Sequence, residues 1–559
     1  MIIVGVNKSS HDASVVLMKD NEIIFYIESE RLSHVKHDEF PFMAMSKIKD
    51  YVDHVDVIAL AGFFDSTIYD EGKSDNVYKS YILGLNKTFS ENKDNIKKYD
   101  FGRSHHATHA AVAFYNSGFD EALCVVKDGA GSYFKPMPTE NQNMFARESS
   151  SYFTAKYPEE ILLINQHIIT PYRIKNEQFE EWIDDFRYHN NSFSEGTAFE
   201  IFAEEIGLTR YDSGKIMGMS AYGKYEDIVP QIYKNNYINT DIFAFKDFLN
   251  DQYFNYENID KNNFQSLANF AYALQTQVQD HVAKEILDML EKTNQKKLCL
   301  SGGFFLNCVS NYNLLKQLPK DVEIYVEPIS SDAGTAIGAA KLAYYIETQS
   351  KEIKKQNHIY YGPKYSYTKN DLVNEKIIED ITPADVAKII SEKNIVAIYQ
   401  GSSEAGPRAL GNRSILYDPR DPNGKDHVNV VKKREWYRPF AGSVLKENAK
   451  EWFDLVNLDE SKFMMFAVDV LEDKKDLIPA ITHVDGTCRV QTVAIEDNPN
   501  FYDLINEFYK ITNVPILFNT SFNLAGDTIV ETLNDALWTL HNSEIMFLYL
   551  PELKVLVTK

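Results

Sequence analysis

The chain has 559 residues and a mass of 64.2 kDa, which is too long for one hydrophobic core and excludes a small binding module. Hydrophobic residues make up 44% and charged residues 25% of the chain, a composition that excludes disorder as its main state. The formal net charge of -23 disfavours broad, non-specific binding to the phosphate backbone of nucleic acids.

The first elements in chain order read as a β-hairpin followed by a third strand. Strands are predicted at 2–6, 13–18 and 22–27, with a polar loop after the first of them. The same pattern occurs a second time, where an apolar strand predicted at 122–126 is followed by the acidic, Gly-containing loop KDGAGS. Two loops of this kind, each with the size of a phosphate group, predict an internal duplication.

The first loop holds His11 beside Asp12. A histidine next to a carboxylate is a candidate general base for deprotonating a hydroxyl acceptor. The alternative is that Asp12 only caps a turn. In the matching second loop, Asp128 is predicted to orient a water molecule or a metal ion, or else to be an ordinary acidic turn residue.

A pair of histidines, His105 and His109, lies four residues apart in the Ala-rich stretch SHHATHAAVAFYN, which favours helix. Both imidazoles would then project from one helix face, about 6 Å apart at Cβ, which is a metal-chelating spacing. Asp332 follows a predicted strand at 324–326 and is a candidate third ligand, and the set suits Fe(II), Mn(II) or Zn(II). The alternative is a chance pair of surface histidines, with Asp332 as a helix cap.

A glycine turn follows the strand predicted at 297–300, where Ser301-Gly302-Gly303 leads into a helix predicted over 304–315. Glycines at a strand-to-helix turn let the backbone approach a nucleotide and aim helix N–H groups at it. With the duplicated strand-loop units, this turn predicts an α/β fold with the layout of an actin-like ATPase core. The same pieces occur in many other α/β folds, and that alternative stays open.

The domain organisation is predicted from changes in periodicity. We expect a first domain over 1–345, a linker over 346–369, where ETQSKEIKKQNH is polar and aperiodic, and a second α/β domain over 370–559. The stretch at about 135–200 has no clear pattern and is predicted to be an insertion that shapes a substrate mouth.

The cysteines and the hydropathy indicate the compartment. Cys124, Cys299, Cys308 and Cys488 lie far apart with no C-x-x-C pair, which predicts reduced and mostly buried thiols. No uninterrupted apolar stretch of about eighteen residues occurs, and the N-terminal residues lack a basic region and a cleavage site. We therefore expect a cytoplasmic protein without a membrane span.

Residues 401–440 are the strongest anomaly, since they hold eight basic and five acidic residues in an acidic chain. Gly and Pro are interleaved with the charges in GPRALGNRS and KKREWYRPF, so rigid turns would fix where each cation points. Arginines arranged in this way favour bidentate capture of phosphate or carboxylate. A small phosphorylated ligand is preferred over an internal salt-bridge network. The cations are Arg408, Arg413, Arg420, Lys425, Lys432, Lys433, Arg434 and Arg438, and Arg489 and the loop 519–523 add donors of the same kind.

Taken together, the motifs of the chain resemble those of the O-carbamoyltransferase family, which includes the Nod-factor, cephem and tobramycin carbamoyltransferases. The resemblance runs almost end to end. It rests, in this order, on VGVNKSSHDASVVL, HHATHAAVAF, VVKDGAGSY, GKIMGMSAYG, LCLSGGFFLNCVSN, SSDAGTAIGAA, GPRALGNRSIL, KKREWYRPFAGSVL, THVDGTCRVQTV and ILFNTSFNLAGDTIV.

The resemblance implies a duplicated actin-like ATPase domain followed by a YrdC-like α/β domain. Members of the family use carbamoyl phosphate and ATP, with Mg as a candidate partner of ATP, to form carbamoyl-adenylate in the C-terminal domain. The carbamoyl group then passes to an acceptor hydroxyl in the N-terminal domain, and AMP leaves. Activation makes chemical sense because carbamate is a poor electrophile, and the adenylate gives it a better leaving group and a handle for binding energy.

The resemblance also implies the site residues. His105, His109 and Asp332 match an iron-type metal site, for which Mn and Zn are alternatives, and His11 and Asp12 match the catalytic positions near the acceptor. The implied nucleotide-binding residues are Asp128, Gly302, Gly303 and Asn307. The implied residues for carbamoyl phosphate and ATP are Arg408, Arg413, Lys432, Arg434, Arg489, Ser521 and Asn523, where the match is ambiguous between Lys432 and Lys433 and favours Lys432.

Two other functions are weighed against carbamoyl transfer. An actin-like sugar or acyl kinase would explain the N-terminal domain but not the basic island, and a non-enzymatic scaffold would explain neither the histidines nor the cations. Candidate acceptors are a small-molecule hydroxyl compound, a sugar, a hydroxymethylpyrimidine nucleotide or DNA. The composition resembles that of an AT-rich genome, so a phage protein in host cytoplasm is one alternative, and a homodimer is another open expectation.

Overall fold

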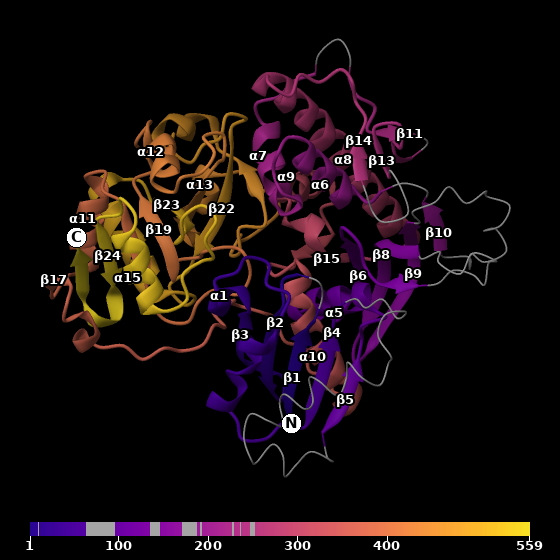
Figure 1. Ribbon diagram of the computed structural model, residues 1–559, viewed down its shortest axis with the longest axis horizontal. Helices are drawn as coiled ribbons and strands as arrows, with labels where there is room; N and C mark the ends of the chain where they lie inside the picture. Colours follow the sequence, from indigo (N-terminus) through magenta and orange to yellow (C-terminus); the bar gives the residue numbers. More distant parts are fainter. Residues whose placement is uncertain are drawn as a thin grey trace. The chain divides into compact units, whose positions relative to one another are not determined.

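A computed structural model describes residues 1–8, 11–62, 96–134, 146–169, 187–190, 193–225, 229–234, 236–245 and 252–559 (Figure 1). The chain divides into two compact units. Unit 1 consists of Met1–Ser29 and His37–Gln356, and unit 2 consists of Glu30–Lys36 and Asn357–Lys559. The main division falls inside the stretch predicted as a linker. The sequence did not indicate that the short segment Glu30–Lys36 belongs to unit 2.

The first sheet of unit 1 has the strand order β3-β2-β1-β4-β5. Its central strand β1 pairs antiparallel with β2 and parallel with β4. The strands are β1 (Ile2–Asn7), β2 (Ser14–Lys19), β3 (Glu22–Glu28), β4 (Val57–Ala61) and β5 (Lys97–Asp100). The predicted hairpin and its third strand are confirmed.

The second sheet of unit 1 repeats this arrangement. Its order is β10-β9-β8-β6-β15-β16, and its strand β6 pairs antiparallel with β8 and parallel with β15, as β1 does with β2 and β4. The duplicated actin-like arrangement is therefore confirmed. The strands are β6 (Glu121–Lys127), β7 (Tyr133–Phe134), which pairs with β8, then β8 (Ala146–Lys156), β9 (Glu160–Ile169), β10 (Arg187–Asn190), β15 (Lys297–Ser301) and β16 (Glu323–Val326).

The predicted insertion at about 135–200 is wrong for part of its length, because β8 and β9 are strands of this sheet. Residues 135–145, 170–186 and 191–192 of the stretch lie outside the described residues. The strand pattern was hidden because β8 buries the polar side chains of Ser149, Ser150 and Ser151. A buried run of serines does not show the apolar alternation by which a strand is detected.

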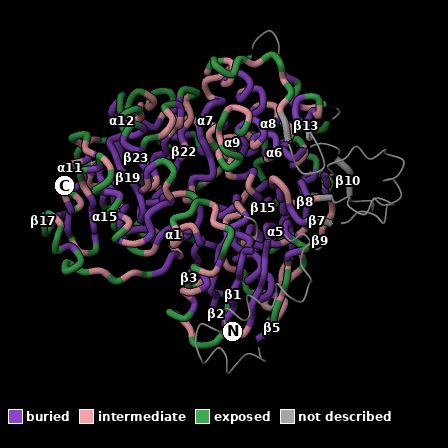
Figure 2. Tube along the Cα trace, viewed as in Figure 1, coloured by how far each residue is buried: buried purple, intermediate pink, exposed green. Residues whose placement is uncertain are grey.

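The two helices beside the predicted site pack against each other, and each lies on a different sheet: the one that begins at His105 packs on the second sheet and the one that follows Asp332 packs on the first. Helix α10 (Thr335–Thr348) contacts α5 (His105–Ser117), β1 and β4. Its residues 335–345 are buried, and burial over the rest of the chain is shown in Figure 2. The contact is close because of Gly338: a Cβ there would lie 2.0 Å from the carbonyl oxygen of Thr108. The small-residue run of SSDAGTAIGAA is thus required by helix packing.

The remaining helices of unit 1 lie on both sheets: the first of them contacts β2 of the first sheet, and the others pack with one another beside the second sheet (Figure 1). They are α2 (Phe42–Met45), α6 (Glu195–Glu205), α7 (Ser213–Ser220), α8 (Phe264–Thr293) and α9 (Cys308–Gln317). Two short hairpins pair β11 (Tyr233–Lys234) with β12 (Tyr237–Ile238), and β13 (Phe243–Phe245) with β14 (Gln252–Phe254).

Unit 2 is an α/β domain around a mixed sheet with the order β17-β25-β24-β18-β19-β23-β20-β22-β21. Its α/β composition is the one expected for the second domain, and the YrdC-like type stays a prediction. The strands are β17 (Lys376–Glu379), β18 (Val396–Tyr399), β19 (Arg413–Tyr417), β20 (Ala441–Leu445), β21 (Ala467–Asp469), β22 (Thr487–Val493), β23 (Ile516–Ser521), β24 (Phe547–Leu550) and β25 (Val555–Thr558). The helices are α1 (Glu30–Ser33), α11 (Pro383–Ser391), α12 (Gly424–Val431), α13 (Ala449–Trp452), α14 (Pro499–Thr512) and α15 (Leu533–His541).

Candidate functional site

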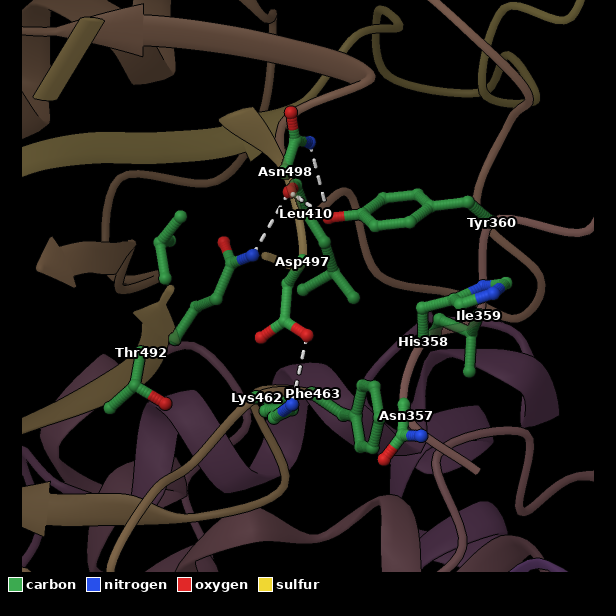
Figure 3. Close-up of a pocket in the computed structure, with 12 residues that line it drawn as sticks. Asn357, His358, Ile359, Tyr360, Leu410, Lys462, Phe463, Thr492, Asp497 and Asn498 are labelled. Atoms are coloured by element: carbon green, nitrogen blue, oxygen red, sulfur yellow. Dashed lines mark hydrogen bonds and ion pairs between the residues drawn. The ribbon is translucent and has the colours of Figure 1, made fainter. Parts of the chain in front are cut away.

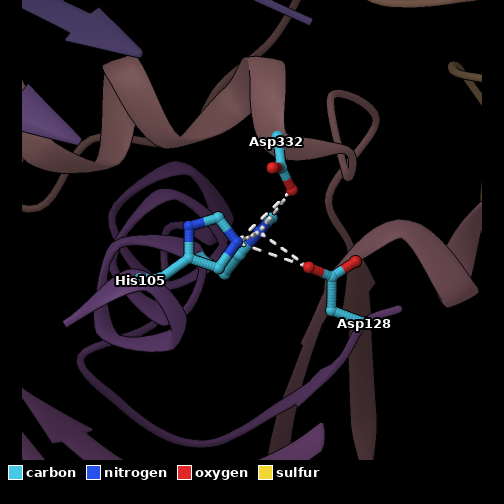
Figure 4. Close-up of side chains that lie close together, drawn as sticks. His105, Asp128 and Asp332 are labelled. Carbon is cyan, nitrogen blue, oxygen red and sulfur yellow. Dashed lines mark hydrogen bonds and ion pairs between the residues drawn. The ribbon is translucent and has the colours of Figure 1, made fainter. Parts of the chain in front are cut away.

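Four buried side chains of unit 1 converge on one point: His105, His109, Asp128 and Asp332 (Figure 4). Nε2 of His105 lies 3.1 Å from Nε2 of His109. The same His105 atom lies 3.3 Å from Oδ2 of Asp128 and 3.3 Å from Oδ1 of Asp332. Nε2 of His109 lies 3.5 Å from that Asp332 oxygen and 3.9 Å from that Asp128 oxygen. We call this set the His/Asp cluster.

Three separate segments carry the His/Asp cluster. His105 and His109 occupy the first two turns of α5, Asp128 directly follows β6, and Asp332 begins the short 3-10 turn before α10. Nδ1 of His109 lies 3.2 Å from Oγ of Ser301 at the end of β15. A ring whose second nitrogen is held in this way keeps its orientation toward a ligand.

The donor set of the His/Asp cluster fits a divalent metal ion. Two imidazoles and two carboxylates are ligands of Fe(II), Mn(II) and Zn(II). Ligand atoms about 2.1 Å from a metal in tetrahedral geometry lie about 3.4 Å from one another, which is close to the separations of the cluster. Within the described residues, no hydrogen-bond donor reaches the buried Oδ2 of Asp332. Two buried carboxylates so placed need a cation.

The electrostatics of the His/Asp cluster point the same way. Burial by itself lowers the pKa of His105, but the charges of Asp332 and Asp128 raise it to about 10. Burial would raise the pKa of Asp332, and the neighbouring His105 and His11 hold it well below its usual range. The carboxylates thus draw positive charge into the cluster, and a bound metal ion would replace the protons that they otherwise hold on the histidines.

His11 and Asp12 lie at the edge of the His/Asp cluster. Nε2 of His11 is 3.7 Å from Oδ2 of Asp332, and Nδ1 of His11 is 3.3 Å from Oδ2 of Asp12. Burial lowers the pKa of His11, but Asp332 and Asp12 raise it to about 10. A cation among the carboxylates would offset that effect and leave His11 able to accept a proton.

The glycine turn contacts the His/Asp cluster directly, because the backbone N–H of Gly303 donates to Oδ1 of Asp128 over 3.1 Å. The helix predicted over 304–315 is wrong at its start, where residues 303–306 form a 3-10 turn. Asn307 ends this turn and caps α9, since its Oδ1 accepts from the N–H of Ser310. Its Nδ2 donates to Oε1 of Gln275.

Replacing Gly302 with alanine should destabilise unit 1 by roughly 2–5 kcal/mol. Gly302 has φ +101, and a Cβ there would lie 2.1 Å from the carbonyl oxygen of Lys127, so both conformation and space exclude a side chain. Gly214→Ala is the matched control, because Gly214 lies in α7 with open space at its Cβ. Urea unfolding measures both variants, and equal midpoints would contradict the prediction.

In unit 2 the structure brings Lys432, Ser521 and Asn523 together. Nζ of Lys432 donates to the backbone oxygens of Ser521 and Asn523 and to Oδ1 of Asn523. Lys432 is buried, whereas Lys433 is exposed. Burial, together with the charges of Arg434 and Arg438, holds the pKa of Lys432 well below its usual range.

Arg434 lies close enough to Arg438 and Arg489 to be repelled by both, and Arg438 also pairs with Glu435 at 3.4 Å. Burial and the charges of Arg438 and Arg489 hold the pKa of Arg434 well below its usual range. The Arg434 guanidinium lies over the ring of Phe440 at 4.3 Å, and its Nη2 donates to the carbonyl oxygen of Pro439. Arginines crowded in this way favour an anion such as phosphate. Arg408 is half-buried on the preceding Gly- and Pro-rich loop.

Arg413 has a different environment from these cations. It is fully buried, and its guanidinium donates to the carbonyl oxygens of Gln400, Gly401 and Glu531 and lies 3.9 Å from the ring centre of Tyr399. These partners engage the guanidinium on several sides. Arg413 therefore braces the loop after β18, and its role in binding carbamoyl phosphate or ATP stays a prediction.

The Arg413→Met variant should accordingly lose stability. Three loop carbonyls and the stacked Tyr399 would lose their partner, at a cost of roughly 3 kcal/mol or more. Chemical unfolding of the full chain measures the loss. An unchanged midpoint together with lost ATP binding would instead support the ligand-binding prediction.

A pocket of unit 2 does not coincide with these cations (Figure 3). It is lined by Tyr360, Leu410, Lys462, Asp497 and Asn498 among others. Its charged groups pair with each other, since Nζ of Lys462 lies 2.9 Å from Oδ1 of Asp497. None of the predicted site residues lines it.

Sequence reasoning missed the network of Lys127, which directly precedes Asp128. Lys127 is fully buried, and its Nζ lies 2.7 Å from Oε2 of Glu285, 3.1 Å from Oε1 of Glu195 and 3.1 Å from Oγ of Ser150. Glu195 and Glu285 form a second acidic group with His281, but the Lys127 ammonium already lies between the two carboxylates. No local pattern could reveal it, because the two glutamates lie 68 and 158 residues away in the chain.

Comparisons with known proteins decide the family. The sequence-family model described as Carbamoyltransferase N-terminus matches residues 71–341. The family model described as Carbamoyltransferase C-terminus matches residues 387–558. The chain is 30% identical to the nodulation protein NolNO of Sinorhizobium fredii, over 96% of this chain and 78% of that protein. It is 32% identical to NolO of Bradyrhizobium diazoefficiens, over 79% of this chain and 76% of that protein.

The chain belongs to the carbamoyltransferase family. The family resemblance read from the motifs is thus confirmed, and the protein is a transferase. In this carbamoyltransferase the N-terminal match lies within unit 1, which carries the His/Asp cluster, and the C-terminal match lies within unit 2, which carries the crowded arginines.

Solved structures resemble this carbamoyltransferase only distantly. HypF in its phosphate- and nucleotide-bound form is 15% identical, covers 63% of this chain and 56% of its own, and has a TM-score of 0.35. HypF of T. kodakarensis is 14% identical, covers 63% and 48%, and has a TM-score of 0.38. Among the described residues of the carbamoyltransferase, no helix has the length and hydropathy to span a bilayer.

Proposed function

We propose that the protein is an ATP-dependent O-carbamoyltransferase with two half-reactions in two units. Unit 2 forms carbamoyl-adenylate from carbamoyl phosphate and ATP, and unit 1 transfers the carbamoyl group to an acceptor hydroxyl. The observation that carries the proposal is the His/Asp cluster with His11 at its edge, because this places metal ligands beside a candidate base in a member of the family.

The first half-reaction suits the crowded arginines. Carbamoyl phosphate loses phosphate to water and yields carbamate, and a carbamate oxygen then displaces pyrophosphate from the α-phosphorus of ATP. Both substrates bring several negative charges, which Arg434, Arg438 and Arg489 would neutralise. Lys432 and the Ser521–Asn523 loop lie on the same unit and would orient the phosphates.

The second half-reaction suits the edge of the His/Asp cluster. A divalent ion held by His105, His109, Asp128 and Asp332, with Fe(II) preferred and Mn(II) or Zn(II) as alternatives, would polarise an acyl or phosphate oxygen. His11 accepts the proton of the acceptor hydroxyl as its oxygen attacks the carbamoyl carbon. The bond to AMP breaks, and AMP leaves with the electron pair.

Product analysis tests the proposal. The purified protein with ATP, labelled carbamoyl phosphate and a panel of hydroxyl acceptors should give AMP, pyrophosphate and an acceptor heavier by one carbamoyl group. Release of ADP without dependence on carbamoyl phosphate would show a kinase instead. Failure to bind either substrate would favour a non-enzymatic scaffold.

The acceptor class in this proposal is a small molecule with a hydroxyl group. The nodulation proteins among the relatives support the family assignment, but their names do not state which acceptor they modify. A hydroxymethylpyrimidine nucleotide, DNA, a homodimer and the cytoplasmic location stay predictions from the sequence.

A further inference from the structure

His37 lies outside the His/Asp cluster and contacts Asp12, the residue that is paired with the proposed base His11. We propose that His37 is a positioning residue of the transfer half-reaction, which fixes the carboxylate of Asp12 so that Asp12 can orient His11 toward the cluster. The proposal rests on the proposed function of His11.

The three side chains form a continuous chain of contacts. Nδ1 of His37 lies 2.7 Å from Oδ1 of Asp12, and Nδ1 of His11 lies 3.3 Å from the other Asp12 oxygen, Oδ2. Nε2 of His11 then lies 3.7 Å from Oδ2 of Asp332. Asp12 is thus held between two imidazoles, and the far nitrogen of the inner one points to a residue of the His/Asp cluster.

A backbone hydrogen bond joins the segments that contain Asp12 and His37, through the residue that follows each of them. The N–H of Ala13 donates to the carbonyl oxygen of Asp38 over 2.8 Å. Nδ2 of Asn7 donates to the carbonyl oxygen of Asp12 over 2.9 Å. Asp12 and His37 have φ of 54 and 56, in the left-handed region that non-glycine residues seldom adopt. Such conformations persist where the surroundings enforce them, and they gather at functional sites.

Tyr211 holds the outer imidazole in place. Its ring stacks on His37 with the ring centres 4.1 Å apart and an angle of 20° between the planes. The same ring meets His11 edge-on at 5.7 Å. The His37 ring is therefore confined by Tyr211 on its face and by Asp12 at its Nδ1 atom.

The chain of contacts matters because of the two imidazole nitrogens of His11. A carboxylate ion-paired with Nδ1, as Oδ2 of Asp12 is at 3.3 Å, favours the tautomer with the hydrogen on that atom and leaves the lone pair on Nε2, the atom that faces the cluster. Without His37, the Asp12 carboxylate can rotate away, and His11 loses its orientation. Removing an outer partner of this kind typically lowers activity about 10- to 100-fold.

The His37→Ala and His37→Asn variants test the proposal. Asparagine offers an N–H near the position of Nδ1 and tolerates the left-handed backbone, so it should recover most of the activity that alanine loses. We expect His37→Ala to lower kcat for carbamoyl transfer by about 10- to 100-fold with little change in KM for the acceptor. Pyrophosphate release should stay at the wild-type rate. His54→Ala is the matched control, because His54 is an exposed histidine of unit 1 that pairs with its neighbour Asp53.

Two results would overturn the role of His37: an unchanged kcat in His37→Ala, or equal losses in the alanine and asparagine variants. A readout that does not depend on activity is the downfield proton resonance of an imidazole N–H bound to a carboxylate, which should vanish in His37→Ala. If the wild type shows this resonance and His37→Ala shows it unchanged, the proposal is also contradicted. If the wild type carbamoylates no acceptor while the resonance behaves as expected, the proposed function fails and the placement of His37 stands.

Discussion

The His109→Ala variant should lose carbamoyl transfer while it continues to release pyrophosphate from ATP and carbamoyl phosphate. His109 is a buried member of the His/Asp cluster, and its Nε2 lies 3.5 Å from Oδ1 of Asp332. Its loss leaves three of the four side chains around a buried, negatively charged position. Transfer should fall by at least about 10²-fold, as when a group that stabilises transition-state charge is removed.

Bound metal provides the independent readout for His109→Ala. Elemental analysis of the purified variant should show a clear loss of metal relative to the wild type. His541→Ala is the control, because His541 lies exposed in unit 2 and pairs with Glu375. If His109→Ala lost pyrophosphate release and transfer together, the division of the two half-reactions between the units would be wrong.

The Arg434→Gln variant should show the opposite pattern. Removing this guanidinium deletes a cation that Arg438 and Arg489 already destabilise, and glutamine keeps part of the aliphatic stem over Phe440. Adenylate formation should fall about 10²-fold, while the free energy of unfolding changes by less than about 1 kcal/mol. Carbamoyl phosphate-dependent exchange of labelled pyrophosphate into ATP measures the first quantity, and urea unfolding measures the second.

Lys433→Gln is the matched control for Arg434→Gln, since it removes an exposed cation from the adjacent position. Inorganic phosphate should raise the unfolding midpoint of the wild type and of Lys433→Gln more than that of Arg434→Gln. Full exchange activity in Arg434→Gln would remove the crowded arginines from the proposed anion site.

Sequence reasoning performed best where one periodic pattern determines both an element and its function. The spacing of His105 and His109 predicts a helix and a shared face, and α5 provides both. Asp332 could be linked to them only through the predicted strand before it and the family resemblance. The strand pattern 2–6, 13–18 and 22–27 closely matches β1 to β3, because these mostly buried strands are short apolar runs bounded by polar turn residues.

Long-range polar contacts account for what sequence reasoning missed. Asp128 was predicted to orient a water molecule or a metal ion and, by resemblance, to bind nucleotide, but only the fold, in which β6 pairs with β15, shows that it joins the His/Asp cluster. The backbone carbonyls that Arg413 contacts are likewise not encoded in any local pattern. Strands β8 and β9 were missed because buried serines resemble a loop.

Metal depletion of the wild-type protein tests the division of labour between the units most directly. The metal-free protein, given carbamoyl phosphate, ATP and an acceptor, should release pyrophosphate and accumulate carbamoyl-adenylate, and transfer should resume when metal is restored. Carbamoylated acceptor formed at the full rate by the metal-free protein, or loss of pyrophosphate release on depletion, would contradict the account.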